Sequence, residues 1–326
     1  MSPDTVEKFE ISDVVSIYDS LKAELSKVIM GQETVVDNIL VSLFAGGHVL
    51  IEGIPGLGKS LLAYSISHIL GGEYKRIQFT PDLMPSDIVG TTIYNSELNA
   101  FSAKKGPVFC NILLADEINR APAKTQSALL QAMQEKHVTL DGTDYPLDDF
   151  FICIATQNPI EMEGTYPLPE AQIDRFFMKI LMDYPSIEEE RSLLKNYRAG
   201  FDAADLSGAD LNNIIRKQDI GKIKSVLNSV TVDDKIIDYI TDLVTATRDY
   251  PGIEVGSSPR GSVDLFKASR VMAVLSNRDF VIPDDVKEVA FPVLRHRMIL
   301  EVEAQIESIH PDELLRSIID KVAVPR

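Results

Sequence analysis

The chain has 326 residues, of which 45% are hydrophobic, enough for two domains or one large domain with a sizeable core. Its formal net charge of −17, from 49 acidic and 32 basic residues, argues against a general nucleic-acid binder, because such proteins present a basic face. We expect a soluble, cytoplasmic protein, because no apolar run approaches the roughly 20 residues that span a bilayer and the acidic N-terminus lacks a signal-peptide pattern.

Two helices are predicted ahead of the first strand. Apolar residues recur at helical spacing over residues 11–28, and a second helical segment covers residues 33–44. Gly31 and Gln32 break the pattern between the two segments.

The run from Gly53 to Ser60 is the strongest chemical signal, because it fits the phosphate-loop pattern G-x-x-x-x-G-K-[ST]. The apolar run 48–52 before it predicts a buried strand, and the segment from Leu61 onward predicts a helix. Glycine lets several backbone N–H groups converge on a triphosphate, and the helix N-terminus adds partial positive charge. We expect Lys59 to contact the β- and γ-phosphates and Ser60 to offer its hydroxyl to Mg²⁺. The residues assigned to nucleotide binding here are Gly53, Ile54, Pro55, Gly56, Leu57, Gly58, Lys59, Ser60 and Leu61.

The turn at Gly31 and Gln32 lies upstream of this loop, where a nucleotide base can lie. A plain helix–helix turn explains its spacing equally well, so both interpretations stay open.

The helix that follows the phosphate loop ends at a Gly-Gly pair, and a strand, a loop and a hairpin are predicted after it. Residues 74–79 alternate as a strand does, and the prolines and glycine of residues 81–90 mark a structured loop. Residues 91–109 are predicted to form two short strands around a turn, a hairpin that would interrupt the main sheet.

Two adjacent carboxylates, Asp116 and Glu117, end an apolar strand over residues 111–115. At the carboxyl end of a parallel strand they would face the ligand crevice. Asp116 would hold Mg²⁺ through water, and Glu117 would orient and deprotonate the attacking water. The pattern is weak alone, since strands often end in acids, but it is strong downstream of a phosphate loop.

A helix over residues 122–135, a hairpin over 138–145 and a buried strand over 150–155 are predicted next. Asn158 follows this strand. Its amide either holds the water or the γ-phosphate or belongs to an ordinary strand-ending turn, and spacing leaves both open.

Arg175 precedes a fifth strand, predicted over residues 177–182. From its context alone, Arg175 is either a surface ion-pair partner of Asp174 or an arginine finger offered to the phosphate of a neighbouring subunit. The surface interpretation is favoured on local sequence.

We place a domain boundary at Tyr184-Pro185, between a nucleotide-binding α/β domain (1–184) and a helical C-terminal domain (185–326). No strand is predicted in the second part, and Ser257 or Ser258 is expected to cap the helix that begins at Arg260. The helices expected there are 187–198, 211–217, 223–228, 233–247, 260–275 and 283–294.

The cysteines and histidines carry little functional information. Cys110 and Cys153 lie in apolar runs and are interpreted as buried thiols in a reducing compartment. The five histidines have no ligand spacing, so no structural metal is expected.

Together these blocks resemble the AAA+ ATPases, and within them the MoxR family, from about residue 17 to the C-terminal helices. The resemblance implies an α/β fold: a P-loop core with a five-stranded parallel sheet flanked by helices, plus a smaller all-α lid. The most specific blocks are 53–60 (Walker A), 113–121 (Walker B), 155–159 and 166–176.

The same resemblance implies roles that spacing did not decide. Asn158 is similar to sensor 1, Arg175 to an arginine finger acting in trans, and Arg260 of the Ser-Pro-Arg run to sensor 2. The segments 91–109 and 138–145 are similar to hairpins that, in relatives, point into a central pore and touch the client.

The family implies Mg²⁺-dependent ATP hydrolysis by a homo-oligomer, a hexameric ring, acting as a chaperone-like remodeller of partner proteins. Such partners often carry a von Willebrand factor A domain, and this one would be a separate polypeptide. The alternatives are the motor subunit of a metal chelatase, a nucleic-acid motor, which the charge of −17 disfavours, and a nucleotide-gated scaffold with little turnover, which would not need Glu117.

Overall fold

The computed structural model describes residues 9–96, 99–159, 165–202, 211–215 and 217–325. The chain divides into two compact units, residues 23–213 and residues 1–22 with 214–326. The division falls inside the first helix, α1 (Ile11–Ser26). Each unit is described by itself, and the predicted functional boundary at Tyr184-Pro185 stays a proposal.

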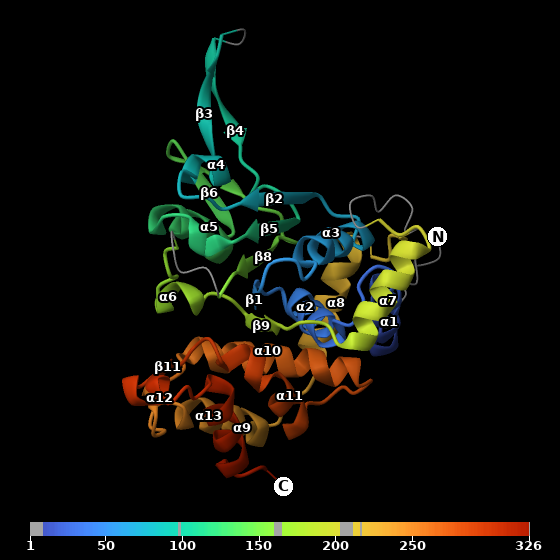
Figure 1. Cartoon of the computed structure of the whole chain (residues 1–326), viewed down its shortest axis with the longest axis vertical. Coiled ribbons are helices and arrows are strands. Elements are labelled where there is room, and N and C mark those ends of the chain that lie inside the picture. The colour runs from blue at the N-terminus through green and yellow to red at the C-terminus, as the bar shows by residue number, and fades with distance from the viewer. Residues whose placement is uncertain (1–8, 97–98, 160–164, 203–210, 216, 326) are drawn as a thin grey trace, which may run out of the picture. The chain divides into compact units, whose positions relative to one another are not determined.

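The unit of residues 23–213 is built on a five-stranded sheet in the order β2-β5-β8-β1-β9, with every neighbouring pair parallel (Figure 1). The predicted five-stranded parallel sheet is confirmed. Because parallel strands end at one edge, the residues that follow β1, β5 and β8 meet there. The strand bounds are β1 Val49–Gly53, β2 Tyr74–Gln78, β5 Ile112–Asp116, β8 Ile152–Gln157 and β9 Met178–Met182.

The central strands are buried on both faces, as their continuous apolar runs indicate. In β5, Leu113 and Ala115 join a core cluster with Leu129 and Met133 of helix α5 (Ala123–Glu135). Side chains alternate along a strand, so Asp116 belongs to the opposite face from Ala115. Helix α3 (Lys59–Ile69) lies against β5 and β2, and helix α2 (Glu33–Ala45) lies against β9.

The segment 81–90, predicted as a loop, contains the short helix α4 (Pro85–Val89). Pro85 starts it with a preset φ, and the Asp87 carboxylate accepts the Met84 N–H at 2.9 Å, which caps the first turn. The remaining short helices of this unit are η1 (Ile118–Arg120), α6 (Glu170–Ile173) and α7 (Ile187–Arg198).

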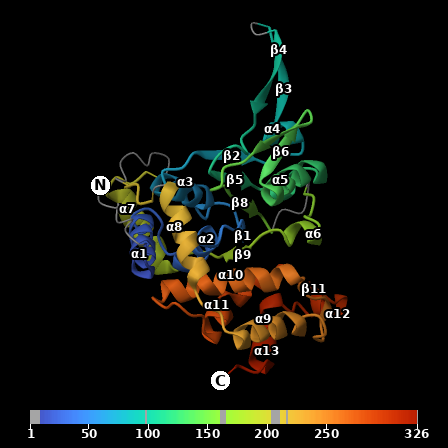
Figure 2. The same cartoon turned by 180° about the vertical axis from the view of Figure 1, so that it is seen from behind.

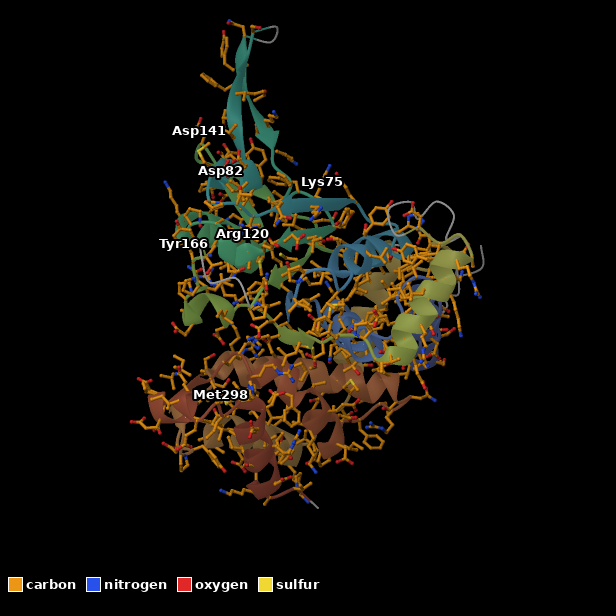
Figure 3. The ribbon with its side chains drawn as sticks, viewed as in Figure 1. Lys75, Asp82, Arg120, Asp141, Tyr166 and Met298 are labelled. Atoms are coloured by element: carbon orange, nitrogen blue, oxygen red, sulfur yellow. The ribbon has the colours of Figure 1, made fainter. Side chains whose placement is uncertain are left out.

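Both predicted hairpins are present as separate two-stranded antiparallel sheets. Strands β3 (Gly90–Asn95) and β4 (Ala100–Lys105) form the first, whose turn includes residues 97 and 98, outside the described residues. Strands β6 (His137–Leu140) and β7 (Thr143–Pro146) form the second. Figures 1 and 2 show the first hairpin extending away from the sheet, with β6 near its base, and Figure 3 labels Asp141 at the turn of the second.

Strands β3 and β6 of the two hairpins are in contact, and a side chain of β4 also reaches β7. The Lys105 ammonium lies 4.9 Å from the centre of the Phe109 ring and 6.0 Å from that of Tyr145 on β7. The neck of the first hairpin is a close backbone crossing of Gly90 and Gly106. A Cβ added at Gly90 would overlap backbone atoms of residues 104–106, and one added at Gly106 would overlap backbone atoms of residues 88–90.

The second unit is mostly helical. Ser258 caps α10, as predicted, by accepting the Arg260 N–H at 3.2 Å. Two short strands, β10 (Ile253–Val255) and β11 (Ile299–Leu300), also pair there, which the all-α expectation missed. The helices are α8 Lys217–Ser229, α9 Asp234–Ala246, α10 Pro259–Leu275, α11 Pro283–Leu294, α12 Val302–Ile306 and α13 Pro311–Lys321.

The helix predicted over residues 211–217 is wrong for the part that the structure describes. Residues 211–215 are not helical, residue 216 lies outside the described residues, and α8 begins at Lys217. The segment contains the weak helix formers Asn212 and Asn213, and a tertiary contact holds it instead: the Asn212 N–H and Nδ2 donate to the Glu24 carboxylate at 3.0 and 3.4 Å. Within the described residues, none of the helices combines the length and the apolar character needed to cross a membrane.

Candidate active site

The glycine-rich loop between β1 and α3 has the open shape that a phosphate group needs. Gly56 and Gly58 adopt left-handed backbone conformations, with φ of +86° and +82°. A Cβ built on either would meet no atom within 4 Å, so both glycines border open space. Gly58 is the N-cap of α3 and brings no capping side chain, so no side chain competes with an anion for the first-turn N–H groups.

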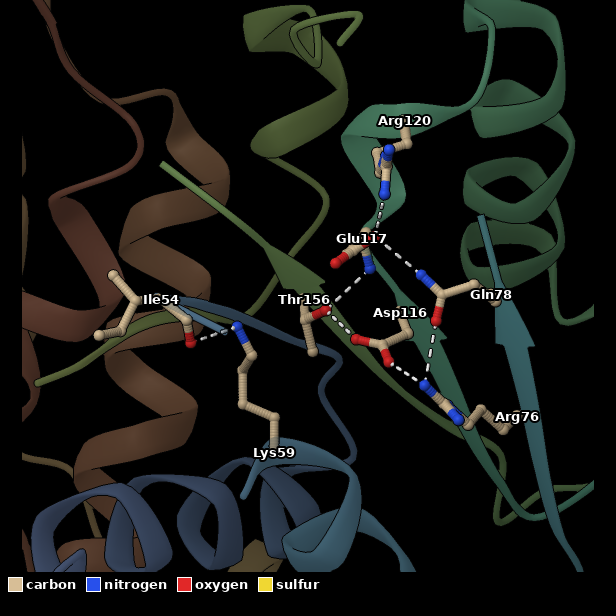
Figure 4. A network of polar contacts seen from close by, with 8 residues as sticks. All are labelled: Ile54, Lys59, Arg76, Gln78, Asp116, Glu117, Arg120 and Thr156. Atoms are coloured by element: carbon tan, nitrogen blue, oxygen red, sulfur yellow. Dashed lines mark hydrogen bonds and ion pairs between the residues drawn. The ribbon is translucent and has the colours of Figure 1, made fainter. Parts of the chain in front are cut away.

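Lys59, at the first position of α3, is buried with its ammonium against the loop. Its Nζ donates to the carbonyl oxygens of Gly53 at 2.6 Å and Ile54 at 3.2 Å (Figure 4). Burial lowers the pKa of Lys59, and the negative charges of Asp116 and Glu117 oppose that shift. Ser60 and Leu61 follow in the first turn of the same helix.

Both carboxylate oxygens of Asp116 have partners. Oδ1 accepts a hydrogen bond from the Thr156 hydroxyl at 2.6 Å, and Oδ2 forms an ion pair with Arg76 Nη2 at 2.7 Å. Thr156 belongs to β8 and Arg76 to β2, the two strands that flank β5. Asp116 is therefore fixed from both sides at the carboxyl edge of the sheet.

Glu117 leaves β5 in a left-handed backbone conformation, with φ of +55°, which turns the chain sharply into η1. Its N–H donates to Thr156 Oγ1 at 2.8 Å. Its Oε2 accepts from Gln78 Nε2 at 2.8 Å and from Arg120 Nη1 at 3.1 Å. A non-glycine residue at positive φ is uncommon and here aims the carboxylate along the edge of the sheet (Figure 4).

Four residues of this network were not expected from the sequence: Arg76, Gln78, Arg120 and Thr156. Arg76 and Gln78 alternate with Ile77 on β2, so they share one face of the strand. The register pairs Gln78 with Asp116, which brings that face to the two carboxylates. The alternation was visible in the sequence, but the adjacency of β2 and β5 was not.

Asn158 follows β8, the strand between β1 and β5. It therefore lies at the edge of the sheet between the phosphate loop, which follows β1, and Asp116, which ends β5. It is buried, and its carbonyl oxygen lies 3.4 Å from Asn119 Nδ2. The structure thus brings Asn158 to the same edge as the two acids.

The two predicted arginines are placed differently. Arg175 follows α6 and is partly buried, and both interpretations of its role stay predictions. Arg260 lies in the first turn of α10, in the other compact unit, so its role stays a prediction.

A cavity of about 220 Å³ lies beside the phosphate loop. Gln32 lines it and ties two segments together, because its Nε2 donates to the Asp183 carbonyl at 3.2 Å. Gly31 is needed at the turn, since its φ is +68° and an added Cβ would collide with Glu189. The lining includes Val28, Ile29, Met30, Gln32, Gly56, Leu57, Gly58, Leu61, Glu189, Tyr197 and Phe201.

This cavity favours the base-site interpretation of the Gly31-Gln32 turn over that of a plain turn. It is mainly apolar, it adjoins Gly56 and Gly58, and it can receive the flat face of a nucleotide base. The contribution of α7, through Tyr197, was not anticipated, because this helix had been assigned to the lid.

The donor set fits a magnesium–nucleotide complex. Ser60 and Asp116 supply hydroxyl and carboxylate oxygens, the ligands that Mg²⁺ prefers. The open side of Gly56 and Gly58 fits a phosphate that a Cβ would exclude.

The fold and this site together define a P-loop protein with a parallel α/β core and a helical lid region. Residues 48–178 match the profile of the ATPase family associated with various cellular activities (AAA), and residues 245–318 match an AAA lid domain.

Curated relatives share this organisation over most of their length. The chain is 43% identical over 312 residues to Chaperone MoxR1 of Mycobacterium tuberculosis, covering 93% of the chain and 81% of the relative. It is 44% identical over 301 residues to the uncharacterized protein YeaC of Bacillus subtilis, covering 92% of each, and 31% identical over 323 residues to Protein MoxR of Methylorubrum extorquens, covering 93% of each. A crystal structure of an ATPase candidate from Cytophaga hutchinsonii matches with a TM-score of 0.88, 42% identity and 97% coverage of both chains.

The chain belongs to the MoxR family of AAA ATPases. Membership implies that it binds and hydrolyses ATP, typically with Mg²⁺, and suggests an oligomer.

Proposed function

We propose that this protein is a ring-forming, Mg²⁺-dependent ATPase that uses hydrolysis to remodel or activate partner proteins. The observation that carries the proposal is the meeting of Lys59, Asp116 and Glu117 at one edge of the sheet, beside an open glycine loop.

Phosphate binding falls to the loop and Lys59. The backbone N–H groups at the start of α3 hold the β- and γ-phosphates, and the Lys59 ammonium leaves the carbonyls of Gly53 and Ile54 to contact them. The base lies in the cavity that Gln32 and Tyr197 line.

Ser60 and Asp116 hold the metal, Asp116 partly through water. Mg²⁺, when bound, neutralises charge on the phosphates as the terminal bond breaks. Thr156 keeps the Asp116 carboxylate in place during this process, because its hydroxyl also anchors the backbone of Glu117.

Glu117 acts as the general base. Its Oε2 accepts the hydrogen bonds from Gln78 and Arg120. Within the described residues Oε1 has no recorded partner, so this oxygen orients the attacking water and takes its proton. Asn158 contacts the γ-phosphate or the water from the neighbouring strand.

The arginines connect the site to the rest of a ring. We assign Arg175 to the phosphate of a neighbouring subunit and Arg260 to the nucleotide of its own chain, as arginine finger and sensor 2. A hexameric ring is a closed, heterologous assembly in which each interface completes one site.

The client contact falls to the two hairpins. The first carries Tyr94 and Phe101, which are exposed and lie edge to face with ring centres 5.3 Å apart. One relative is named a chaperone, which supports a protein client over a nucleic acid. A cytoplasmic client with a von Willebrand factor A domain is the specific proposal.

The test compares nucleotide binding and hydrolysis in two variants. Lys59→Ala should abolish ATP binding, whereas Glu117→Gln should bind ATP and lose hydrolysis by roughly 10²- to 10⁴-fold, the usual contribution of a general base. Full turnover by Glu117→Gln would assign the base elsewhere. Stimulation of wild-type hydrolysis by DNA, and not by protein clients captured on Glu117→Gln, would favour a nucleic-acid motor instead.

A further inference from the structure

Arg76 is the one cation that pairs with Asp116 in the described residues. Its Nη2 lies 2.7 Å from Asp116 Oδ2 and 3.0 Å from Gln78 Oε1. The Arg76 side chain is 49% exposed, whereas the Asp116 side chain is 11% exposed. A half-exposed positive charge therefore lies on the carboxylate that is proposed to hold the metal.

The ion pair and a metal ion compete for the same carboxylate. Thr156 occupies Oδ1 with a neutral hydroxyl and Arg76 occupies Oδ2 with a full charge. Mg²⁺ demands near-ideal octahedral oxygen ligands, directly or through its waters. A guanidinium at 2.7 Å blocks Oδ2 as an acceptor and repels a divalent cation beside it.

We propose that Arg76 is a displaceable counter-ion of Asp116, which must leave Oδ2 before the site accepts Mg²⁺ with its nucleotide. This inference rests on the proposed function, because it requires that Asp116 holds the metal. Arg76 is a positioning residue in this scheme: it contacts neither nucleotide nor water but sets how strongly Mg²⁺ favours nucleotide binding.

The location of Arg76 makes its displacement feasible. It lies on β2, the edge strand of the sheet, so the far side of its side chain borders solvent and not another strand. Thr156, by contrast, is fully buried on the central strand β8. Its hydroxyl must also stay in place to accept the Glu117 N–H. Only the Arg76 contact can exchange without disturbing the strand that carries the base.

The test measures the affinity of a fluorescent, non-hydrolysable ATP analogue in excess Mg²⁺ and in EDTA. The ratio of the two Kd values reports how much Mg²⁺ favours binding. Arg76→Gln should raise this ratio roughly three- to tenfold over wild type, the effect of removing one partly exposed ion pair and its repulsion. The rise should come from tighter binding in excess Mg²⁺, that is, from a lower Kd under that condition than the wild type has.

Lys75→Gln is the matched control. Lys75 is the neighbouring residue on β2, labelled in Figure 3, and its ammonium pairs with Glu73 at 2.9 Å and not with Asp116. Its loss should leave the ratio at the wild-type value. Arg76→Lys keeps the charge and should give a ratio close to wild type, which separates the charge from any effect of altered packing.

Three outcomes would overturn the inference. An unmoved or lowered ratio in Arg76→Gln would show that Arg76 does not compete with the metal. A ratio that rises only because binding in EDTA weakens, with the Kd in excess Mg²⁺ unchanged, would show that Arg76 acts on the nucleotide and not on the metal. Failure of the wild type to bind the analogue would overturn the proposed function and this inference with it, whereas the first two results leave the proposed function standing.

Discussion

The hydroxyl of Thr156 donates a 2.6 Å hydrogen bond to Oδ1 of Asp116. The Thr156 hydroxyl oxygen, Oγ1, also accepts the backbone N–H of Glu117 at 2.8 Å. One small side chain on the central strand β8 thus sets the position of the two adjacent acids of β5. Their separation and direction depend on the register of two strands and on a single hydroxyl.

Replacing this hydroxyl should lower both catalysis and stability. Thr156→Val keeps the shape of the side chain but leaves the Glu117 N–H without its acceptor and Asp116 without one donor. We expect a loss of about 1–3 kcal/mol in the free energy of unfolding and at least a roughly tenfold lower kcat, since 1.4 kcal/mol of lost positioning already gives that factor. Thr156→Ser, which keeps the hydroxyl, should retain most activity in the same steady-state assay. Equal kcat for Thr156→Val and wild type would mean that the hydroxyl does not position the acids.

The proposed shared site predicts a dependence of ATPase activity on protein concentration. The specific activity of the wild type should rise as subunits assemble. The specific activity of Arg175→Ala should stay low at every concentration, and a true arginine finger predicts a value roughly 10³-fold or more below that of the assembled wild type. Nucleotide affinity of the Arg175→Ala monomer should be unchanged. Arg191→Ala, an exposed arginine on α7, is the control.

Mixing provides a second check on the same residue. Arg175→Ala subunits mixed with Glu117→Gln subunits should regain activity, because some interfaces then combine an intact Arg175 with an intact Glu117. No gain on mixing, or a flat specific activity in the wild type, would count against a finger in trans and favour independent subunits.

His48 should make stability depend on pH. The ring is fully buried, and Nδ1 accepts the Cys153 N–H at 3.0 Å while Nε2 lies 3.2 Å from the Met133 carbonyl. Burial lowers its pKa from 6.5 to about 4, with a smaller lowering from the charge of Lys136. The neutral ring with Nε2–H as donor satisfies both contacts.

The direction of this effect follows from proton binding. Between pH 6.5 and about 4 the unfolded chain binds the His48 proton and the folded chain does not. The free energy of unfolding therefore falls as the pH falls through this window, by up to about 3 kcal/mol, and is constant in this respect above it. Urea titrations of wild type and His48→Gln across the window isolate the contribution, because the carboxylates are common to both proteins. Parallel pH profiles would contradict a buried neutral imidazole.

The neck of the first hairpin should not tolerate a methyl group. An added Cβ at Gly106 would overlap the Ile88 carbonyl oxygen and the Gly90 nitrogen, both backbone atoms that cannot rotate away. Gly106→Ala should cost about 1–3 kcal/mol of stability, as overpacking does, and should speed amide exchange in β3 and β4. Gly221→Ala, in helix α8, meets nothing within 4 Å and should be neutral or stabilising by about 0.5–1 kcal/mol. Wild-type exchange rates in Gly106→Ala would show that the crossing has room to adjust.

Much of the core could be predicted because its signals are local. The phosphate loop, the apolar strand ending in Asp116 and the Asp-Gly turn of the second hairpin each depend on neighbours in sequence, and the structure has the expected elements at these places. The five strands were found one by one, from apolar runs and turn residues.

The partners of the two acids could not be found in this way. Arg76 and Gln78 reach Asp116 and Glu117 only because β2 pairs with β5, a pairing between segments about 40 residues apart that no local pattern records. The three-residue strand β10 and two-residue strand β11 are too short to show alternation. Residues 211–215 look helical in sequence, but they include the weak helix formers Asn212 and Asn213, and a distant contact with the Glu24 carboxylate holds Asn212.

Lys105 has a mechanical consequence. Its ammonium lies over Tyr145 of β7 as well as over Phe109, so a strand of one hairpin is tethered to a strand of the other. The sequence presents two separate excursions from the sheet, but in space they share a joint at their bases. We therefore expect a displacement at the base of one hairpin to be felt at the base of the other, while Tyr94 and Phe101 lie exposed on the first hairpin.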